Sequence, residues 1–184
     1  MQKPHNRAFT TKWNGIARVL SSDISVSEVF FPGTTNEPEP LKKSYHGIWD
    51  TGATASVITA RVAAELGLRP IGMTRVSTAG GMRDQNEYLV NFYLPNKVAI
   101  TQVRVTEAQL ANDLDILVGM DIICLGDFVV TNKDGKTIFS FRFPSCEAID
   151  FVSTHSIGPM SIDGRGLMPT NRAERRRFKK QGRL

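Results

Sequence analysis

The sequence predicts a mainly β protein, a barrel or folded sheet with one or two short helices and a basic C-terminal helix or tail. Short runs rich in β-branched and aromatic residues recur between turn residues, while only a few short segments look helical. The length of 184 residues suits one domain with extensions. Hydrophobic residues make up 41% and charged residues 22% of the chain, so the composition is that of a globular protein that folds without metal or disulfide support.

The first elements are expected to be strands. Ile16–Leu20 and Val26–Phe31 predict a hairpin around the segment SSDIS, and residues 32–43 form an exposed connector rich in proline and acid. Tyr45–Asp50 returns to an extended conformation. The polar residues before this hairpin, 1–14, lack any periodicity and are expected to form a loose arm.

A short helix at 60–66 is expected next, with Thr59 at its start and Gly67 at its end. The turn sequences AGGMRDQ, LPNK and NKDG separate the strands that follow. The expected elements after this helix are strands at 73–78, 86–94 and 98–105, a turn or short helix at 108–113, an apolar run at 116–118, a short helix at 120–125, and strands at 127–131 and 136–143.

The C-terminal part divides into two segments. A folded domain is expected at residues 15–145. Residues 146–170 follow it and are expected to be loop-rich, with one strand near Phe151. Residues 171–184 carry seven basic residues against one glutamate, and a basic helix is expected at 172–181. Because the whole chain has a net charge of +5, the part before this tail is close to neutral.

Composition also bears on location and cofactors. No run approaches the roughly 18 apolar residues of a membrane span, and the N-terminus lacks the apolar centre of a signal peptide, so we expect a cytoplasmic protein without membrane contact. Cys124 and Cys146 form no CxxC pair and are expected to be reduced core thiols. The three histidines have no metal-ligand spacing, so no metal and no cofactor are expected.

The segment IWDTGATASVI places the ionisable Asp50 among apolar residues. A phosphate-binding hairpin of the sugar-kinase type needs two large subdomains, and a phosphatase nucleophile needs a second Asp where Gly52 stands. A third interpretation uses Asp50 as one half of an acid and base pair that activates water, which requires a second aspartate. A tight turn in which Asp50 only caps neighbouring amides also stays open.

Two motifs together resemble the retropepsin-like aspartic proteases, particularly their bacterial and retroelement members. They are DTGA, beginning at Asp50, and ILVGMD, which holds Gly119 about 65 residues later, with the helix ending in LGL between them. The resemblance covers roughly residues 45–143. Trp49 departs from it, because the family usually has a smaller aliphatic residue there.

The resemblance implies an aspartic endopeptidase that acts on peptide or protein substrates as a homodimer. Each copy contributes one Asp50 to a shared site, and the sequence agrees in having a single D-[ST]-G motif. In this family pattern Thr51 donates a hydrogen bond across the dimer, Gly52 permits close approach, and Ala53 packs behind them. The remaining implied residues are the supports Leu117, Val118 and Gly119, and a mobile flap at Thr78, Ala79, Gly80, Gly81 and Met82.

Two alternatives remain beside this hypothesis. One is a retropepsin-type dimer that binds partners without catalysis. The basic tail is compatible either with a solvated end or with a helix that docks on nucleic acid, a ribosome or another acidic surface through phosphate contacts.

Overall fold

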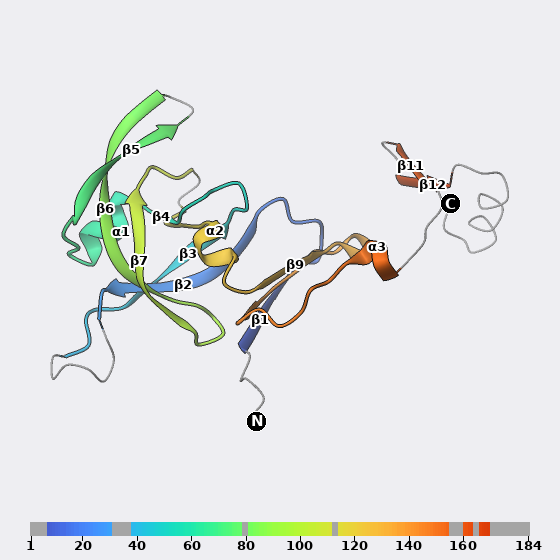
Figure 1. Ribbon diagram of the computed structural model, residues 1–184, viewed down its shortest axis with the longest axis horizontal. Helices are drawn as coiled ribbons and strands as arrows, with labels where there is room; N and C mark the ends of the chain where they lie inside the picture. Colours follow the sequence, from blue (N-terminus) through green and yellow to red (C-terminus); the bar gives the residue numbers. More distant parts are fainter. Residues whose placement is uncertain are drawn as a thin grey trace. The chain divides into compact units, whose positions relative to one another are not determined.

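The computed structural model describes residues 7–30, 38–78, 81–111, 114–154, 160–163 and 166–169 (Figure 1). The chain divides into two compact units, Met1–Glu147 and Ala148–Leu184. The expected basic helix at 172–181 lies outside the described residues, as do Ala79 and Gly80. In the part of the chain that the structure describes, no helix has both the length and the apolar character required to cross a membrane.

The first unit is built around a closed sheet, which confirms the predicted barrel. Its strands are β2 (Leu20–Glu28), β3 (Lys43–Trp49), β4 (Val57–Ile58), β6 (Gly81–Tyr93), β7 (Ala99–Glu107) and β8 (Ile116–Val118). They pair in the order β2-β3-β8-β4-β7-β6, and β6 pairs again with β2, which closes the ring. β5 (Gly72–Thr78) extends this sheet as the antiparallel partner of β6.

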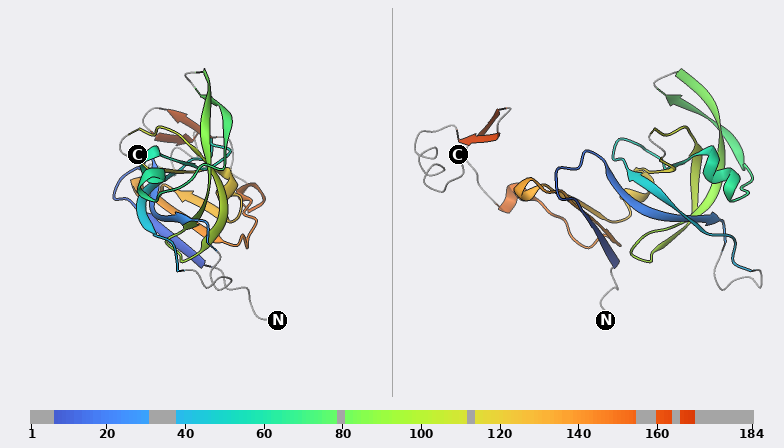
Figure 2. Two further views of the ribbon diagram at one scale, coloured as in Figure 1. Left: turned by 90° about the vertical axis from the view of Figure 1, so that its left-hand side faces the viewer. Right: turned by 180° about the vertical axis from the view of Figure 1, so that it is seen from behind.

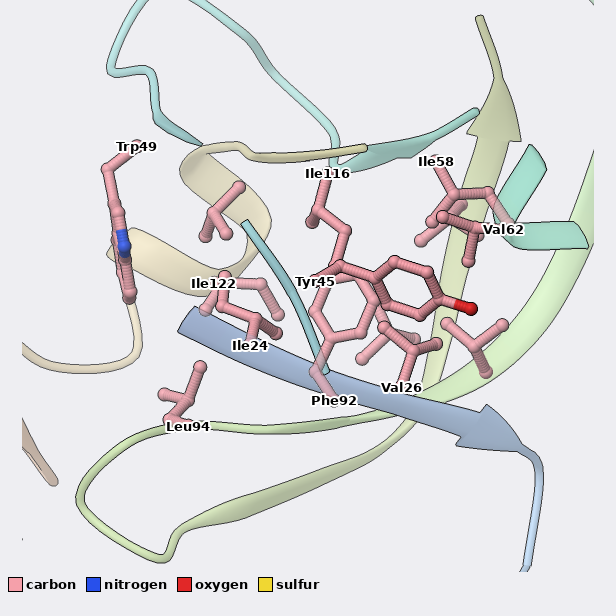
Figure 3. Packing of buried hydrophobic residues seen from close by; sticks show 14 of the residues in the cluster. Ile24, Val26, Tyr45, Trp49, Ile58, Val62, Phe92, Leu94, Ile116 and Ile122 are labelled. Carbon is pink, nitrogen blue, oxygen red and sulfur yellow. The ribbon is translucent and has the colours of Figure 1, made fainter. Parts of the chain in front are cut away.

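Alternating residues of these strands fill the barrel, as strand periodicity requires. Ile24 and Val26 of β2 face Phe92 of β6 and Ile116 of β8, and all four are fully buried (Figure 3). Each side chain of this size contributes about 1.5–3 kcal/mol through removal of its surface from water. Gly47 of β3 leaves room for this packing, because a Cβ there would lie 2.8 Å from Cδ1 of Ile24.

A second sheet, of three strands, contributes several of the aromatic side chains of the core. It consists of β1 (Arg7–Lys12), β9 (Asp127–Thr131) and β10 (Ile138–Phe143), with β10 in the centre. The ring of Trp49 packs against Phe139 and Phe141 with centroid distances of 5.3 and 4.9 Å, and its indole nitrogen donates to Ser22. Trp49 therefore fills the space between the end of β3 and the three-stranded sheet.

The N-terminal predictions were wrong in two places. Arg7–Lys12 belong to a strand that pairs over its whole length with β10, so this part of the expected loose arm is ordered by a partner about 130 residues away. The predicted hairpin around SSDIS is one continuous strand, β2. Its buried face includes the polar Ser22, whose hydroxyl accepts the Trp49 indole, and this polar residue concealed the alternation of the strand.

The two short helices predicted in this unit are present. α1 (Ala60–Glu65) follows Thr59, and α2 (Met120–Ile123) follows Gly119. Thr59 takes the N-cap position without capping the helix through its side chain, since its hydroxyl donates to Asp115 instead. Gly67 adopts a φ of +63°, the left-handed conformation that ends a helix and favours glycine.

The remaining strands follow the predicted turns, with shifted bounds. NKDG forms the 3₁₀ turn η1 (Lys133–Gly135) between β9 and β10, and LPNK separates β6 from β7. The strands on either side of AGGMRDQ form a long hairpin, and β6 begins at Gly81 where a start at residue 86 was predicted. No helix forms among the described residues of the segment 108–113.

Two further predictions were wrong. In the second unit α3 (Phe151–Thr154) replaces the strand expected near Phe151, and the described strands are β11 (Met160–Asp163) and β12 (Gly166–Pro169), which pair with each other. Cys124 and Cys146 are both exposed and are not core thiols. Cys124 ends α2, next to the buried Ile122 and Ile123, so apolar neighbours in the sequence did not imply burial.

Candidate active site

The candidate site is a tight loop at the end of β3. The backbone N–H of Asp50 donates to the carbonyl of Val118 at 2.9 Å, and the Gly52 N–H donates to Oδ1 of Asp50 at 2.8 Å. The N–H of Ala53 closes the turn on the Asp50 carbonyl at 3.2 Å. These bonds fix both the backbone and the carboxylate of Asp50, which is half-buried, while Thr51 and Gly52 are exposed.

Strand β8 holds this loop from the side. It lies between β3 and β4, pairing Val118 with Trp49 in parallel and Leu117 with Val57 in antiparallel register. Val118 is fully buried, and Leu117 is half-buried. Two segments more than 60 residues apart in sequence, Asp50–Ala53 and Leu117–Gly119, are therefore neighbours, as the family resemblance implied.

Gly119 is required by the closeness of this contact. A Cβ at this position would lie 2.6 Å from the carbonyl carbon of Ala55 and 3.0 Å from the carbonyl oxygen of Ala53, both of them backbone atoms. With no side chain there, the N–H of Met120 reaches the carbonyl of Ala53 at 2.8 Å. The glycine of ILVG thus allows the two motifs to bond directly through their backbones.

Sequence reasoning missed a second connection between the motifs. Ser56 is fully buried, and its hydroxyl accepts the Gly119 N–H at 3.1 Å while donating to Oδ1 of Asp121 at 2.8 Å. The N–H of Asp121 donates to the carbonyl of Thr54. Asp121 ends the ILVGMD motif and Ser56 lies three residues after DTGA, and no pattern in the sequence links these two side chains.

The segment expected to form a flap is the end of the β5–β6 hairpin. Thr78 is the last residue of β5 and pairs with Gly81, the first residue of β6, which has a φ of +102°. Met82 follows and is 61% exposed. The hairpin extends beyond the other barrel strands, at the top of the view in Figure 1, and is seen from two further sides in Figure 2.

Other ionisable groups of the barrel are held in structural contacts. Arg61 binds both carboxylate oxygens of the buried Asp115, which precedes β8, with its Nε at 2.9 Å from Oδ1. Burial, reinforced by the hydrogen bond to Glu65, raises the pKa of Tyr45 to about 12, so this hydroxyl remains protonated. Burial likewise raises the pKa of Tyr88, whose hydroxyl donates to Glu107.

The described residues contain no group of three or more His, Cys, Asp or Glu side chains that could hold a metal ion. A carboxylate fixed by its neighbours and open on one side can act as a general base or accept a proton.

Comparisons with known proteins agree with this geometry. Residues 32–122 match the model of a family described as aspartyl protease, and this range contains both the Asp50 loop and Gly119. No match was found among curated proteins.

Three solved structures illustrate the similarity. A retropepsin-like aspartic protease from Rickettsia conorii is 12% identical, with 78% of this chain and 99% of that chain covered and a TM-score of 0.45. The protease of a simian foamy virus is 20% identical over 56% of this chain and 92% of its own, with a TM-score of 0.35. A foamy viral protease-reverse transcriptase in complex with an RNA/DNA hybrid is 22% identical over 58% of this chain and 12% of its own, with a TM-score of 0.37.

Proposed function

We propose that this chain, whose residues 32–122 match the aspartyl protease family model, is a retropepsin-like aspartic endopeptidase whose site is formed by Asp50 from each of two identical subunits. The observation that carries the proposal is the state of the Asp50 carboxylate. Within the described residues its Oδ1 accepts one hydrogen bond, from the Gly52 N–H, and Oδ2 accepts none. A fixed carboxylate with an open oxygen is suited to binding a water molecule.

The need for two copies follows from the sequence, because a single D-T-G motif supplies a single carboxylate. Thr51 and Gly52 are exposed in one chain, which leaves them available to meet the same residues of a second copy around a two-fold axis. In this arrangement Thr51 donates across the axis, and Gly52 lets the two loops approach closely.

The proposed mechanism is the general one of aspartic proteases. Two carboxylates about 3 Å apart cannot both be ionised at low cost, so the pair holds one proton. The ionised Asp50 takes a proton from the bound water while the water oxygen attacks the carbonyl carbon of the peptide. The protonated Asp50 gives its proton to the developing oxyanion. On collapse of the tetrahedral intermediate, the Asp50 that took the water proton passes it to the leaving nitrogen, the other Asp50 takes a proton from a hydroxyl of the intermediate, and the C–N bond breaks.

The β5–β6 hairpin is proposed to close over the substrate. Thr78, Gly81 and Met82 stand at its end, and the left-handed φ of Gly81 suits a tight tip that changes conformation. Closure over a bound peptide would exclude water from the carboxylate pair.

Cleavage of a peptide library at about pH 4–6 tests the proposal. Wild-type protein is expected to cleave, and Asp50→Asn is expected to lower kcat/KM by about 1,000-fold or more, because the amide cannot exchange the proton. Cleavage that survives this substitution would contradict the catalytic assignment. A folded wild-type protein without any cleavage would favour a dimeric binding module.

Subunit mixing tests the shared site separately. Excess Asp50→Asn protein, exchanged into wild-type dimers, is expected to suppress activity in proportion to the mixed dimers formed, because each mixed dimer retains only one carboxylate. Sedimentation velocity follows the dimer itself. A protein that is active while fully monomeric would overturn the two-copy arrangement.

A further inference from the structure

A cavity of about 630 Å³ lies where the root of the β5–β6 hairpin meets the end of β7 and the start of α1. One wall comes from Met73 of β5 and residues 83–86 of β6, and the other from residues 107–110. Asp50 and the end of the hairpin are not among the lining residues, so this cavity is separate from the proposed carboxylate pair. A molecule bound in it would contact the hairpin and the barrel at once.

Glu107 contributes a carboxylate of which one oxygen accepts hydrogen bonds from the described residues and the other accepts none. Its Oε2 accepts the Tyr88 hydroxyl at 2.7 Å and the side-chain amide of Asn86 at 3.3 Å. Within the described residues Oε1 accepts no hydrogen bond, and no Lys, Arg or His forms an ion pair with Glu107. A half-buried carboxylate without a cation is a favourable partner for one.

Gln85 adds a hydrogen-bond acceptor for which the described residues provide no donor. Its Oε1 is buried and has no hydrogen-bond partner among the described residues. Leaving a buried carbonyl oxygen unpaired is unfavourable, so such groups in native proteins usually mark a missing partner. Both Gln85 and Glu107 line the same cavity.

The other charged side chains of the cavity do not supply that partner. Asp84 is paired with Arg75 across the hairpin at 3.0 Å. Arg83 is exposed and is the single cationic residue in the described lining. Its charge lowers the affinity of the cavity for a second cation, which makes Arg83 a useful test position.

We propose that this cavity binds a basic side chain, Lys or Arg, whose N–H groups donate to Glu107 Oε1 and Gln85 Oε1. That this side chain belongs to a protein substrate rests on the proposed protease function. The methylene groups of Lys or Arg fit the apolar part of the wall, which includes Met73 and Leu110. A substrate residue seated here fixes the root of the hairpin against the barrel while the end of the hairpin covers the scissile bond.

Titration of the ¹⁵N-labelled full chain with Nα-acetyl-lysine amide tests binding without requiring catalysis. Shifts of the Gln85 side-chain amide and the Leu110 backbone amide are expected with lysine amide and not with the uncharged Nα-acetyl-norleucine amide. Glu107→Gln keeps an oxygen for the Tyr88 hydroxyl and is expected to weaken binding about fivefold. Arg83→Gln is expected to strengthen it about twofold.

The control is Asp23→Asn, which changes a carboxylate lining another cavity, and it is expected to leave the affinity unchanged. Stronger binding in Glu107→Gln together with weaker binding in Arg83→Gln would indicate a site for anions and overturn the proposal. Equal binding of the norleucine compound or no shift at Gln85 would also overturn it. Binding without peptide cleavage would retain the site and refute the protease function. Cleavage without binding would refute the site alone.

Discussion

Asp50 and Asp127 stand at opposite ends of strands, Asp50 just after β3 and Asp127 at the start of β9, and their surroundings differ in one respect. The carboxylate of Asp127 accepts hydrogen bonds from the Ser145 hydroxyl, the Cys146 N–H and the Arg142 guanidinium. That of Asp50 accepts one, from Gly52, among the described residues. A carboxylate whose oxygens are all engaged is structural, whereas one with an open oxygen is available for chemistry.

Replacing each aspartate by asparagine gives the sharpest test of this contrast. Asp50→Asn is expected to remove cleavage, about 1,000-fold or more in kcat/KM, while changing the melting temperature little. Asp127→Asn is expected to leave kcat nearly unchanged and to lower the melting temperature by several degrees, because Arg142 loses one of its two carboxylate partners and retains Glu147. Calorimetry and peptide cleavage on the same samples measure both effects, and equal loss of activity in the two variants would remove the distinction.

Gly119→Ala tests how tightly the Asp50 loop is held. The added Cβ meets the backbone of Ala55 at 2.6 Å, so the free energy of unfolding is expected to fall by about 2–4 kcal/mol. Gly15→Ala is the matched control, since nothing lies within 4 Å of its Cβ and a change within about 0.5 kcal/mol is expected. Urea unfolding of both variants measures the difference. A Gly119 variant as stable as the control would mean that the two motifs are not in contact.

Ser56→Ala separates support of the site from general stability. Loss of the buried hydroxyl is expected to cost about 1–3 kcal/mol, because the Gly119 N–H loses its acceptor, and to lower kcat about tenfold with a smaller effect on KM. Ser27→Ala is the control, because this buried serine of β2 bonds to Glu28 and Tyr93 away from the loop. Steady-state kinetics that show equal losses of kcat in both variants would reduce Ser56 to an ordinary buried serine.

Acid unfolding gives the smallest expected effect and concerns Asp127 alone. Its hydrogen bonds, first that of Ser145, lower its pKa from 3.8 to about 2 in the folded protein. The folded state therefore binds fewer protons than the unfolded state, and the stabilisation is complete above about pH 4 and lost as the pH falls to about 2. The stability difference between wild type and Asp127→Asn should shrink across this range in urea titrations. A difference that stays constant from pH 5 to pH 2 would contradict the lowered pKa.

Local patterns predicted most of the barrel and the central contact of the candidate site. Strand runs, turn residues and the helix around Val62 are local features, and the family resemblance of DTGA and ILVG implied which distant segments meet. Pairings that depend on the whole fold were not accessible. The polar strand β1 is a strand because β10 offers it a partner, and Ser56 acquires its role from Asp121, 65 residues away.

Burial was the least predictable property. Ser22 looked like part of a turn and is buried because the Trp49 indole requires an acceptor. Cys124 looked like a core residue and is exposed because α2 ends there. In both cases a neighbouring element determines the environment of the residue, and the position of that element cannot be read from a single sequence.

The placement of Trp49 gives this protein an intrinsic optical reporter. Trp49 is 5% exposed, is the last residue of the strand that precedes Asp50, and packs its indole against several phenylalanine rings. Because the chain has only one other tryptophan, Trp13→Phe leaves an emission signal that arises one residue away from the carboxylate. Inhibitor binding and subunit association at this loop can then be followed by fluorescence without an added label.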